Sequence, residues 1–290
     1  IVVEGEGFMK IVIFGATGLL GKELLRRLEE DEVIPLSSRD VNVEDSKKVL
    51  DAIKQIEPDA VINCAAIANP DICEKQPKLA YGVNTIGARN IAVACQYTGC
   101  KDVYISTDHV FGGYNRCDNY YTEFDITSPL NVYGKSKVMG ERFTRELSDK
   151  YFIVRTSILF GIHRDTLVTR SIKQAKRGET IIVPKDQIVS PTYIKDLSFM
   201  IRNLLEGEEY GVYHLTNRGE CSRYELVKEA LYIAGYKDAN IVPVASDFSG
   251  KAKRPLNVVL RNYMLEIMDK PLSRDWHEAL KEFIEEECIC

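Results

Sequence analysis

The stretch of sequence that decides the fold is KIVIFGATGLLG, which occupies residues 10–21. Its first five residues form a short apolar run of the kind that becomes a buried strand. Glycines follow at positions 15, 18 and 21, and leucines then recur at helical spacing up to Leu28. Glycine permits a sharp turn, close approach of backbone N–H groups to a phosphate, and tight packing of helix on strand. Although an ordinary tight turn is the simpler alternative, this order of elements predicts a dinucleotide-binding loop.

Strands and helices continue to alternate through the first half of the chain. Four further apolar runs predict strands, near residues 33–36, 60–62, 103–105 and 152–154. Helical periodicity predicts helices at about residues 20–28, 49–56, 79–97 and 132–147. Pro35 weakens the second strand, because proline cannot donate a hydrogen bond within a sheet. Right-handed crossovers join such units, so we expect an α/β fold with one doubly wound parallel sheet.

The alternation decays beyond about residue 160, where glycine, proline and charged residues interrupt short elements. We therefore expect a dinucleotide-binding domain over residues 9–165 and a smaller C-terminal substrate lobe over residues 166–290. The two are expected to interleave, with late strands contributed from about residues 180–215. Residues 1–8 are interpreted as an extension or an expression remnant. Ligands of such a sheet bind at the carboxyl ends of its strands, so functional motifs should follow strands.

Composition excludes several classes of protein. Of the 290 residues, 45% are hydrophobic and 28% charged, which is typical of globular rather than disordered chains. A net charge of -5 disfavours nucleic-acid and anionic-membrane partners, since both need a basic face. No apolar run approaches the roughly 20 residues of a membrane span, and the N-terminus shows no signal-peptide pattern.

Eight cysteines raise the question of a metal site or disulfides. None forms a CxxC pair, and their spacings match no zinc pattern. We therefore expect reduced thiols, no metal and a cytoplasmic location. Cys288 and Cys290 are expected to lie in a frayed C-terminal tail.

A tyrosine and a lysine four residues apart on a helix share one face and can transfer a proton together. The ammonium stabilises the phenolate, which lowers the phenol's pKa from about 10 toward the working pH. The sequence holds three such pairs, Tyr97–Lys101, Tyr133–Lys137 and Tyr224–Lys228. The first straddles Gly99 at a helix end, and the third lies far from any predicted strand end. Tyr133 and Lys137 alone follow a strand at the distance that places them over a nicotinamide site.

Polar and small residues follow two of the predicted strands. Ser106-Thr107-Asp108 ends the fourth strand, where a hydroxyl can hydrogen-bond a substrate carbonyl and share the proton transfer. A turn that leaves the strand is the alternative interpretation. Beside Tyr133 and Lys137, Thr107 becomes the expected third member of the site. Asn63-Cys64-Ala65-Ala66 ends the third strand, with small residues where a cofactor would pass the backbone closely.

The loop after the second strand bears on the choice between NAD and NADP. An acidic residue there would hold the ribose 2′-hydroxyl of NAD. Hydroxyls and a guanidinium suit the 2′-phosphate of NADP instead. The sequence reads Ser37-Ser38-Arg39-Asp40, which favours NADPH, while Asp40 keeps NADH as an alternative.

Longer stretches resemble a known family. They are MKIVIFGATGLLG, PDAVINCAAIANPDICE, YISTDHVFGG, SPLNVYGKSKVMGE, VRTSILFG, DQIVSPTY and KRPLNVVLRN. Over nearly all of residues 9–285 the chain resembles the dTDP-4-dehydrorhamnose reductases of the extended short-chain dehydrogenase superfamily. The resemblance implies a Rossmann fold and NAD(P)H-dependent reduction of the C4 keto group of a nucleotide-linked sugar, in the family dTDP-4-dehydrorhamnose to dTDP-rhamnose. Family analogy also favours a homodimer.

The resemblance and the motifs together give the expected site residues. The catalytic trio is Thr107, Tyr133 and Lys137. The cofactor contacts are Gly15, Thr17, Gly18, Leu19, Leu20, Gly21, Ser38, Arg39, Asn42, Val43, Cys64, Ala65, Ala66, Asn84, Tyr133 and Lys137. The substrate contacts are Thr107, Asp108, His109, Ile158, Gln187 and Arg254.

Four of these positions depart from the family pattern. Asn42 and Val43 fall where the family usually has an aspartate that contacts adenosine. His109 stands for a tyrosine and Ile158 for a tryptophan, both beside the sugar pocket, which leaves the exact sugar open. The alternatives are a regulatory homologue like the β subunit of methionine adenosyltransferase, or another nucleotide-sugar reductase or epimerase. An intact catalytic trio favours a working reductase over a binding protein.

Overall fold

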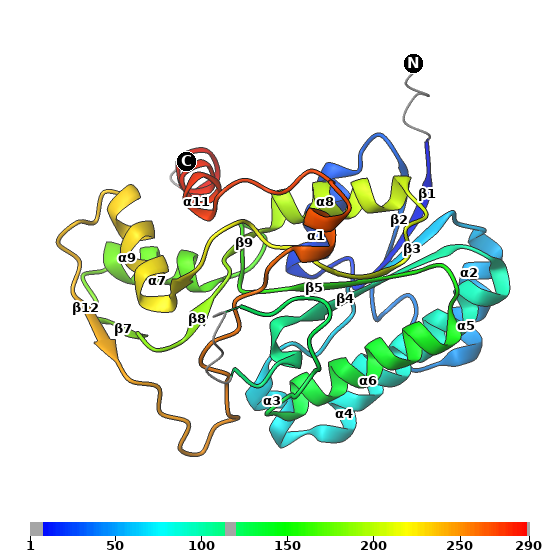
Figure 1. The fold of residues 1–290 in the computed structure, drawn as a ribbon, viewed down its shortest axis with the longest axis horizontal. Helices are drawn as coiled ribbons and strands as arrows, with labels where there is room; N and C mark the ends of the chain where they lie inside the picture. The colour runs from blue at the N-terminus through cyan, green and yellow to red at the C-terminus, as the bar shows by residue number, and fades with distance from the viewer. Residues whose placement is uncertain (1–7, 114–119, 289–290) are drawn as a thin grey trace.

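The computed structural model describes residues 8–113 and 120–288. At its centre lies a six-stranded sheet with the strand order β10-β5-β4-β3-β1-β2 (Figure 1). These strands are β1 (Lys10–Phe14), β2 (Glu32–Leu36), β3 (Ala60–Asn63), β4 (Lys101–Thr107), β5 (Tyr151–Thr156) and β10 (Gly211–His214). All five pairings between them are parallel, which confirms the expected doubly wound sheet.

Helices cover both faces of this sheet. The flanking helices are α1 (Leu19–Arg27), α2 (Ser46–Ile56), α3 (Pro70–Lys75), α4 (Pro77–Tyr81), α5 (Ala88–Thr98), α6 (Val132–Leu147) and α8 (Ile194–Glu206). α2, α5 and α6 pack together on one face, and α1 packs with α8 on the other (Figure 1). The single helix expected over residues 79–97 is divided, because a π-helical segment, η1 (Gly82–Gly87), separates α4 from α5. Such segments often mark functional sites.

The strand that contains Pro35 lies at an edge of the sheet. β2 pairs only with β1, and Pro35 is exposed. A missing N–H costs no sheet hydrogen bond on the unpaired side of an edge strand. The edge position therefore explains how this strand tolerates proline.

The second half of the chain adds one strand to the sheet and builds several smaller units. Of the strands expected from about residues 180–215, β10 joins the sheet beside β5. β7 (Ile181–Pro184) instead pairs with β12 (Ile241–Val244). The remaining elements are β6 (Leu159–Phe160), β8 (Ile188–Val189), β9 (Thr192–Tyr193), β11 (Cys221–Ser222), α7 (Leu167–Lys176), α9 (Arg223–Ile233), α10 (Tyr263–Ile267) and α11 (Trp276–Glu282). The boundary near residue 165 stays a prediction.

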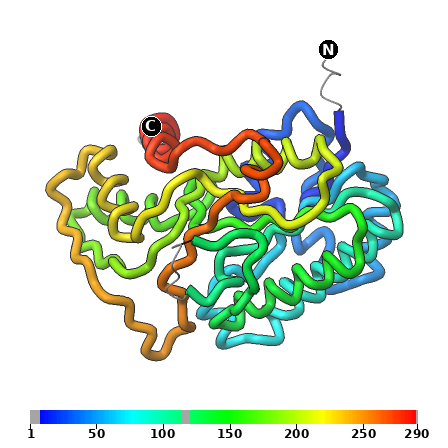
Figure 2. Tube along the Cα trace, viewed as in Figure 1, coloured from blue at the N-terminus to red at the C-terminus, as the bar shows by residue number. Residues whose placement is uncertain are grey.

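After β12 the chain returns to the first half along a path that we call the return segment, residues 252–262 (orange in Figure 2). Within it Leu260 bridges to Tyr121. At its start the backbone N–H of Ala252 donates to the Asp71 carboxylate at 2.9 Å. The return segment thus ties the C-terminal part to helix α3, near the carboxyl ends of the strands.

Some expectations concern the ends of the chain. Residues 1–7 and Cys290 lie outside the described residues, so the extension and the last cysteine are not addressed. Cys288 ends the segment η3 (Phe283–Cys288) and is partly buried against the core, so a frayed tail is wrong for this residue. In the described part of the chain, no helix combines the length and the apolar character needed to cross a bilayer.

A buried ion pair fixes α6 on the sheet. Glu141 of α6 accepts two hydrogen bonds from Arg155 of β5, at 3.0 and 2.8 Å, and one from Ser106 of β4 at 2.5 Å. Both charged side chains are only 3% exposed. Gly140 permits this close packing, because a Cβ there would collide with the Tyr104 hydroxyl.

We predict that Arg155→Met lowers the free energy of unfolding by about 3–5 kcal/mol, because Glu141 then stays buried without its partner. Arg142→Met is the matched control, since Arg142 pairs with Glu146 on the exposed side of the same helix. This control should cost less than about 1 kcal/mol. Urea unfolding followed by circular dichroism measures both values, and equal losses would contradict the role of the buried pair.

Candidate active site

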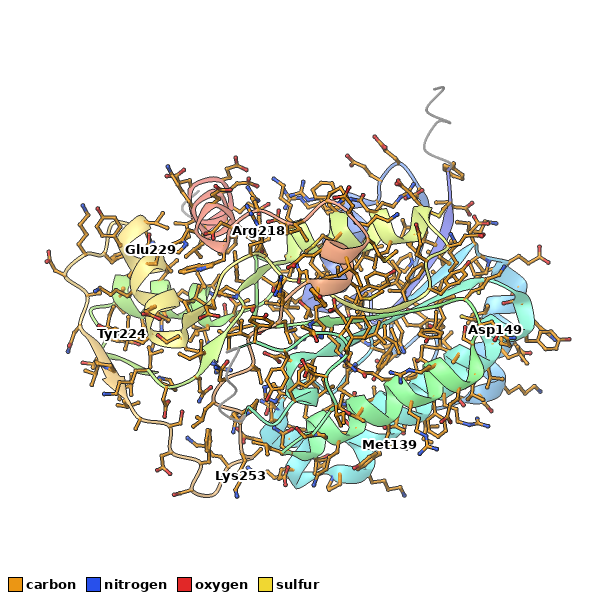
Figure 3. The ribbon with its side chains drawn as sticks, in the orientation of Figure 1. Met139, Asp149, Arg218, Tyr224, Glu229 and Lys253 are labelled. Carbon is orange, nitrogen blue, oxygen red and sulfur yellow. The ribbon has the colours of Figure 1, made fainter. Side chains whose placement is uncertain are left out.

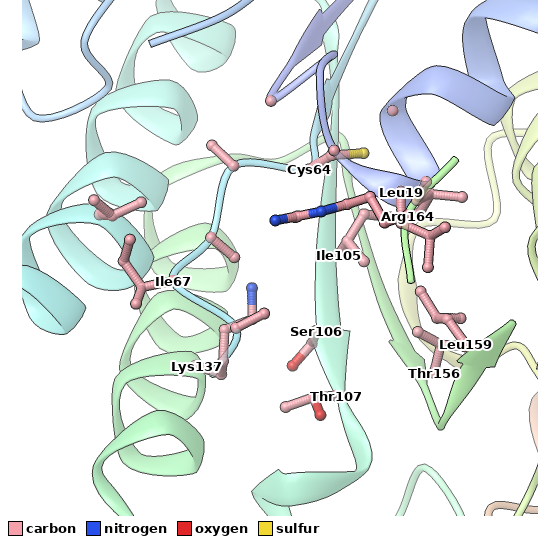
Figure 4. A pocket seen from close by; sticks show the side chains of 18 of the residues that line it. Leu19, Cys64, Ile67, Ile105, Ser106, Thr107, Lys137, Thr156, Leu159 and Arg164 are labelled. Carbon is pink, nitrogen blue, oxygen red and sulfur yellow. The ribbon is translucent and has the colours of Figure 1, made fainter. Parts of the chain in front are cut away.

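A cavity of about 980 Å³ opens at the carboxyl ends of the parallel strands. Its walls come from the segments that follow β1, β2, β3, β4 and β5, and from Arg223 and Arg254 of the C-terminal part. Figure 4 shows Leu19 from α1, Thr107 from β4 and Lys137 from α6 around this space. The motifs that lie far apart in the sequence therefore meet at one site.

The glycine loop has the shape that a pyrophosphate needs. Gly15 adopts a φ of +75°, and a Cβ there would lie 2.6 Å from the backbone N of Ala65. A Cβ on Gly21 would lie 2.5 Å from the Gly15 carbonyl oxygen. Gly18 precedes α1 and makes no side-chain cap, so the first backbone N–H groups of the helix stay available. An uncapped helix N-terminus beside the cavity fits an anionic dinucleotide.

The loop after β2 offers hydroxyls to the cavity rather than a carboxylate. Ser37 and Ser38 both line it. Asp40 turns back instead, and its carboxylate accepts from Ser37 N at 2.8 Å and Ser37 Oγ at 2.6 Å. Arg39 is exposed and does not line the cavity, so its contact with the cofactor stays a prediction. Ser37 and Ser38 are thus the hydroxyl residues with which this loop borders the cavity, and hydroxyls suit a 2′-phosphate.

Thr107, Tyr133 and Lys137 border the same cavity and are all buried. Asn131 caps α6 by accepting from the backbone N–H of Gly134 at 2.8 Å, which sets where the helix begins. Tyr133 and Lys137 follow in its first two turns. The Lys137 ammonium lies 4.1 Å from the centre of the buried Tyr104 ring, so the β4 surface supports its charge.

Burial changes the protonation of the pair. It raises the pKa of the Tyr133 phenol, and a hydrogen bond with Thr107 offsets this only in part. It lowers the pKa of Lys137 to about 7, with the negative charge of Glu141 opposing the shift. The expected lowering of the Tyr133 pKa is therefore wrong here, because desolvation disfavours the charged form of each group. A neutral phenol keeps the proton that a general acid must donate.

The hydroxyl hydrogen of Thr107 is already donated within the protein. Thr107 Oγ1 donates to one Asp108 carboxylate oxygen at 3.0 Å, while Ser157 Oγ donates to the other at 2.6 Å. The backbone N–H of His109 donates to Thr107 Oγ1 at 3.2 Å. The Thr107 hydroxyl therefore lies between the Asp108 carboxylate and the Tyr133 phenol, and its hydrogen can turn from the carboxylate to the phenol oxygen or to a ligand.

Two further residues that were expected to contact a ligand, Asn84 and Gln187, do not line the cavity. Asn84 is fully buried, where its Oδ1 accepts from Ile67 N at 2.8 Å and its Nδ2 donates to Ser136 Oγ at 2.9 Å. It anchors the loop after β3 on α6. Gln187 donates to Ser246 Oγ at 2.7 Å and is likewise buried. Internal partners bind the Asn84 amide and the Gln187 Nε2, and the ligand contacts expected of both residues stay predictions.

The remaining expected residues do line the cavity. They are Gly15, Thr17, Gly18, Leu19, Leu20, Gly21, Ser38, Asn42, Val43, Cys64, Ala65, Ala66, Thr107, Asp108, His109, Tyr133, Lys137, Ile158 and Arg254. Ser157, Arg164 and Arg223 also line it, although no sequence motif predicted them. The Arg164 side chain extends into the cavity near Cys64 (Figure 4). Neither arginine belongs to a recognisable motif, so no local signal marks it.

Comparison with known proteins bears on both halves of the chain. The family described as RmlD substrate binding domain matches residues 9–289. The spore coat polysaccharide biosynthesis protein SpsK of Bacillus subtilis is 36% identical over 280 residues, 96% of this chain and 97% of its own. A dTDP-4-dehydrorhamnose reductase of Aggregatibacter actinomycetemcomitans is 33% identical over 287 residues, 94% of this chain and 97% of its own.

A solved structure shows the same similarity in three dimensions. The dTDP-4-dehydrorhamnose reductase of Bacillus anthracis, in complex with NADP, is 40% identical and has a TM-score of 0.91. The alignment covers 97% of this chain and 99% of that one. Because these similarities span the sheet and the C-terminal part alike, the chain belongs to the dTDP-4-dehydrorhamnose reductase family of NAD(P)-dependent oxidoreductases, as its sequence led us to expect.

Proposed function

We propose that this protein reduces the C4 keto group of a nucleotide-linked sugar, dTDP-4-dehydrorhamnose, with NADPH as cofactor and NADH as the alternative. The observation that carries the proposal is that Tyr133 and Lys137 border the same cavity as the glycine loop. A proton donor and a dinucleotide site in one space are what carbonyl reduction requires. The relatives named as dTDP-4-dehydrorhamnose reductases support this choice of substrate.

Each member of the trio has a distinct role in the proposed reaction. A reduced nicotinamide cofactor, when bound, supplies the hydride to the carbonyl carbon. Tyr133 donates its phenolic proton to the carbonyl oxygen as negative charge develops there. The Lys137 ammonium stabilises the phenolate that results. Thr107 orients the phenol and the carbonyl through hydrogen bonds of its hydroxyl, which also contacts Asp108.

Positive charge on the C-terminal side of the cavity supports a nucleotide-linked rather than a free sugar. Arg254 lines the cavity and pairs with Asp71 through two hydrogen bonds, at 2.8 and 2.6 Å. Arg223 also lines it, and its Nε is shielded from solvent without a hydrogen-bond partner among the described residues. A guanidinium with a spare donor suits the oxygens of a diphosphate.

Assembly and location belong to the same proposal. We expect a homodimer in the cytoplasm, by analogy with the family. Three exposed apolar side chains, Ile86, Val93 and Tyr97, follow one another at helical spacing on η1 and α5 and support an interface there. Light scattering coupled to size exclusion measures the oligomeric state, and a monomer would contradict this expectation.

Tyr133→Phe removes only the proton donor. We predict that kcat falls by about 10²–10⁴, the usual contribution of one general acid, while NADPH binding is retained. Tyr224→Phe and Tyr97→Phe are matched controls and should leave turnover nearly intact. Tyr224 lies in α9 (Figure 3) and is not among the residues that line the cavity, and Tyr97 is exposed. Near-normal turnover in Tyr133→Phe would instead favour a binding homologue.

Gly18→Asp places a carboxylate at the N-terminus of α1. A Cβ there lies 3.1 Å from the Gly15 carbonyl oxygen, which must move by a few tenths of an ångström to admit it. Repulsion between the carboxylate and the pyrophosphate should weaken NADPH binding on the order of 100-fold. Gly18→Ala adds the carbon without the charge and serves as the control. Calorimetry measures both affinities, and equal effects would argue against a phosphate at this position.

The pKa of Lys137, lowered to about 7 by burial, predicts how the reaction depends on pH. The ammonium is the form that stabilises the Tyr133 phenolate, and it loses its proton as the pH rises through that pKa. We therefore expect kcat/KM for reduction to fall above neutral pH with the slope of a single deprotonation. In Lys137→Arg the charge persists, so the residual activity should lack this fall. A flat wild-type profile would refute the assignment.

A further inference from the structure

His109 borders the cavity beside Tyr133, and a single neighbour holds its imidazole. The two rings meet edge to face, with centroids 5.4 Å apart. His109 Nδ1 lies 3.2 Å from Nδ2 of Asn131. No described residue hydrogen-bonds the other ring nitrogen, Nε2, on the side away from Asn131. The Asn131 atom that faces Nδ1 therefore determines which ring nitrogen of His109 carries the hydrogen.

The helix that Asn131 caps fixes the orientation of its amide. Asn131 Oδ1 accepts from the backbone N–H of Gly134 at 2.8 Å. Asn131 Nδ2 donates to the carbonyl of Lys253, in the return segment (Figure 3), at 2.7 Å. A flipped amide would place NH₂ against the Gly134 N–H and oxygen against the Lys253 carbonyl, which are two repulsive contacts. Two backbone groups from distant segments thus require the NH₂ group to face His109.

This orientation determines the tautomer of His109. Because a donor faces Nδ1, Nδ1 must act as an acceptor, and the neutral ring then carries its hydrogen on Nε2. A proton on Nδ1 would point at the NH₂ group of Asn131, so the doubly protonated ring is disfavoured. Burial lowers the pKa of His109 in the same direction. His109 therefore presents a fixed N–H donor in the wall of the cavity, next to the Tyr133 ring.

We propose that the Nε2–H of His109 donates a hydrogen bond to a sugar oxygen next to the one that Tyr133 protonates. Asn131 becomes a positioning residue, which acts on substrate recognition through the tautomer of His109. The identity of the ligand, a nucleotide-linked 4-keto sugar, rests on the proposed function, whereas the tautomer does not.

The tautomer is tested directly by ¹⁵N NMR of the histidine side chains, with the His109 signal assigned from its loss in His109→Gln. Wild-type protein should show Nδ1 as the unprotonated nitrogen. Asn131→Asp keeps an oxygen to cap Gly134 but turns an acceptor toward Nδ1. In that variant Nδ1 should become protonated and the pKa of His109 should rise. An Nδ1–H tautomer in the wild type, or an unchanged ring in Asn131→Asp, overturns the proposal.

A matched pair of variants tests the contact with the substrate. Glutamine places an amide NH₂ near the Nε2 position, whereas asparagine reaches only the Nδ1 position. His109→Asn should therefore raise KM for the 4-keto nucleotide sugar about tenfold, the effect of losing one hydrogen bond, without changing KM for NADPH. His109→Gln should recover most of this loss. His277→Asn, on the exposed start of α11, should have no effect.

The outcomes separate the inference from the proposed function. Equal KM values in His109→Asn and His109→Gln, or no change in either, overturn the role of Nε2–H. A wild-type protein that carries the Nε2–H tautomer but turns over no 4-keto nucleotide sugar overturns the proposed function and the assigned ligand with it. An Nδ1–H tautomer in an active enzyme overturns the inference alone.

Discussion

The ion pair between Glu141 and Arg155 is the contact on which the geometry of the site depends. It joins α6, which carries Tyr133 and Lys137, to the strand next to β4. Both charges are buried, so removing either one would leave the other without a partner at a large cost in stability. The pairing therefore fixes how α6 is rotated and how closely it packs on the sheet. Lys137 lies one turn before Glu141 on the same face, and its height above β4 follows from that contact. The position of Tyr133 and Lys137 thus depends on an ion pair that does not itself line the cavity.

Burial away from water also determines the protonation of Tyr133 and Lys137. Desolvation raises the pKa of Tyr133 and lowers the pKa of Lys137. Both shifts favour the neutral form of the group. A reductase needs the proton on tyrosine first and a positive charge beside it afterwards. Glu141 favours the charged lysine, which links the buried ion pair to the proton transfer. Asp108 accepts a hydrogen bond from Thr107 and so holds that hydroxyl within reach of the phenol.

The C-terminal part of the chain adds residues to the cavity that the glycine loop borders. The return segment binds Asp71 of α3 and brings Arg254 to the cavity, and the start of α9 brings Arg223. The return segment also supplies the Lys253 carbonyl that orients Asn131. The orientation of Asn131, and with it the tautomer that we propose for His109, therefore depends on both the start of α6 and the return segment.

The sequence by itself determined the sheet, the glycine loop at residues 10–21 and the helix that carries Tyr133, because periodicity, turn residues and spacing along one helix are local properties. It marked a carboxamide such as Asn84 as functional without revealing that internal partners already bind it. Only the tertiary structure decided that Arg223 joins the cavity, that burial raises rather than lowers the pKa of Tyr133, and which nitrogen of His109 carries the hydrogen. Desolvation and hydrogen-bond partners depend on residues far apart in the chain, and no local pattern encodes them.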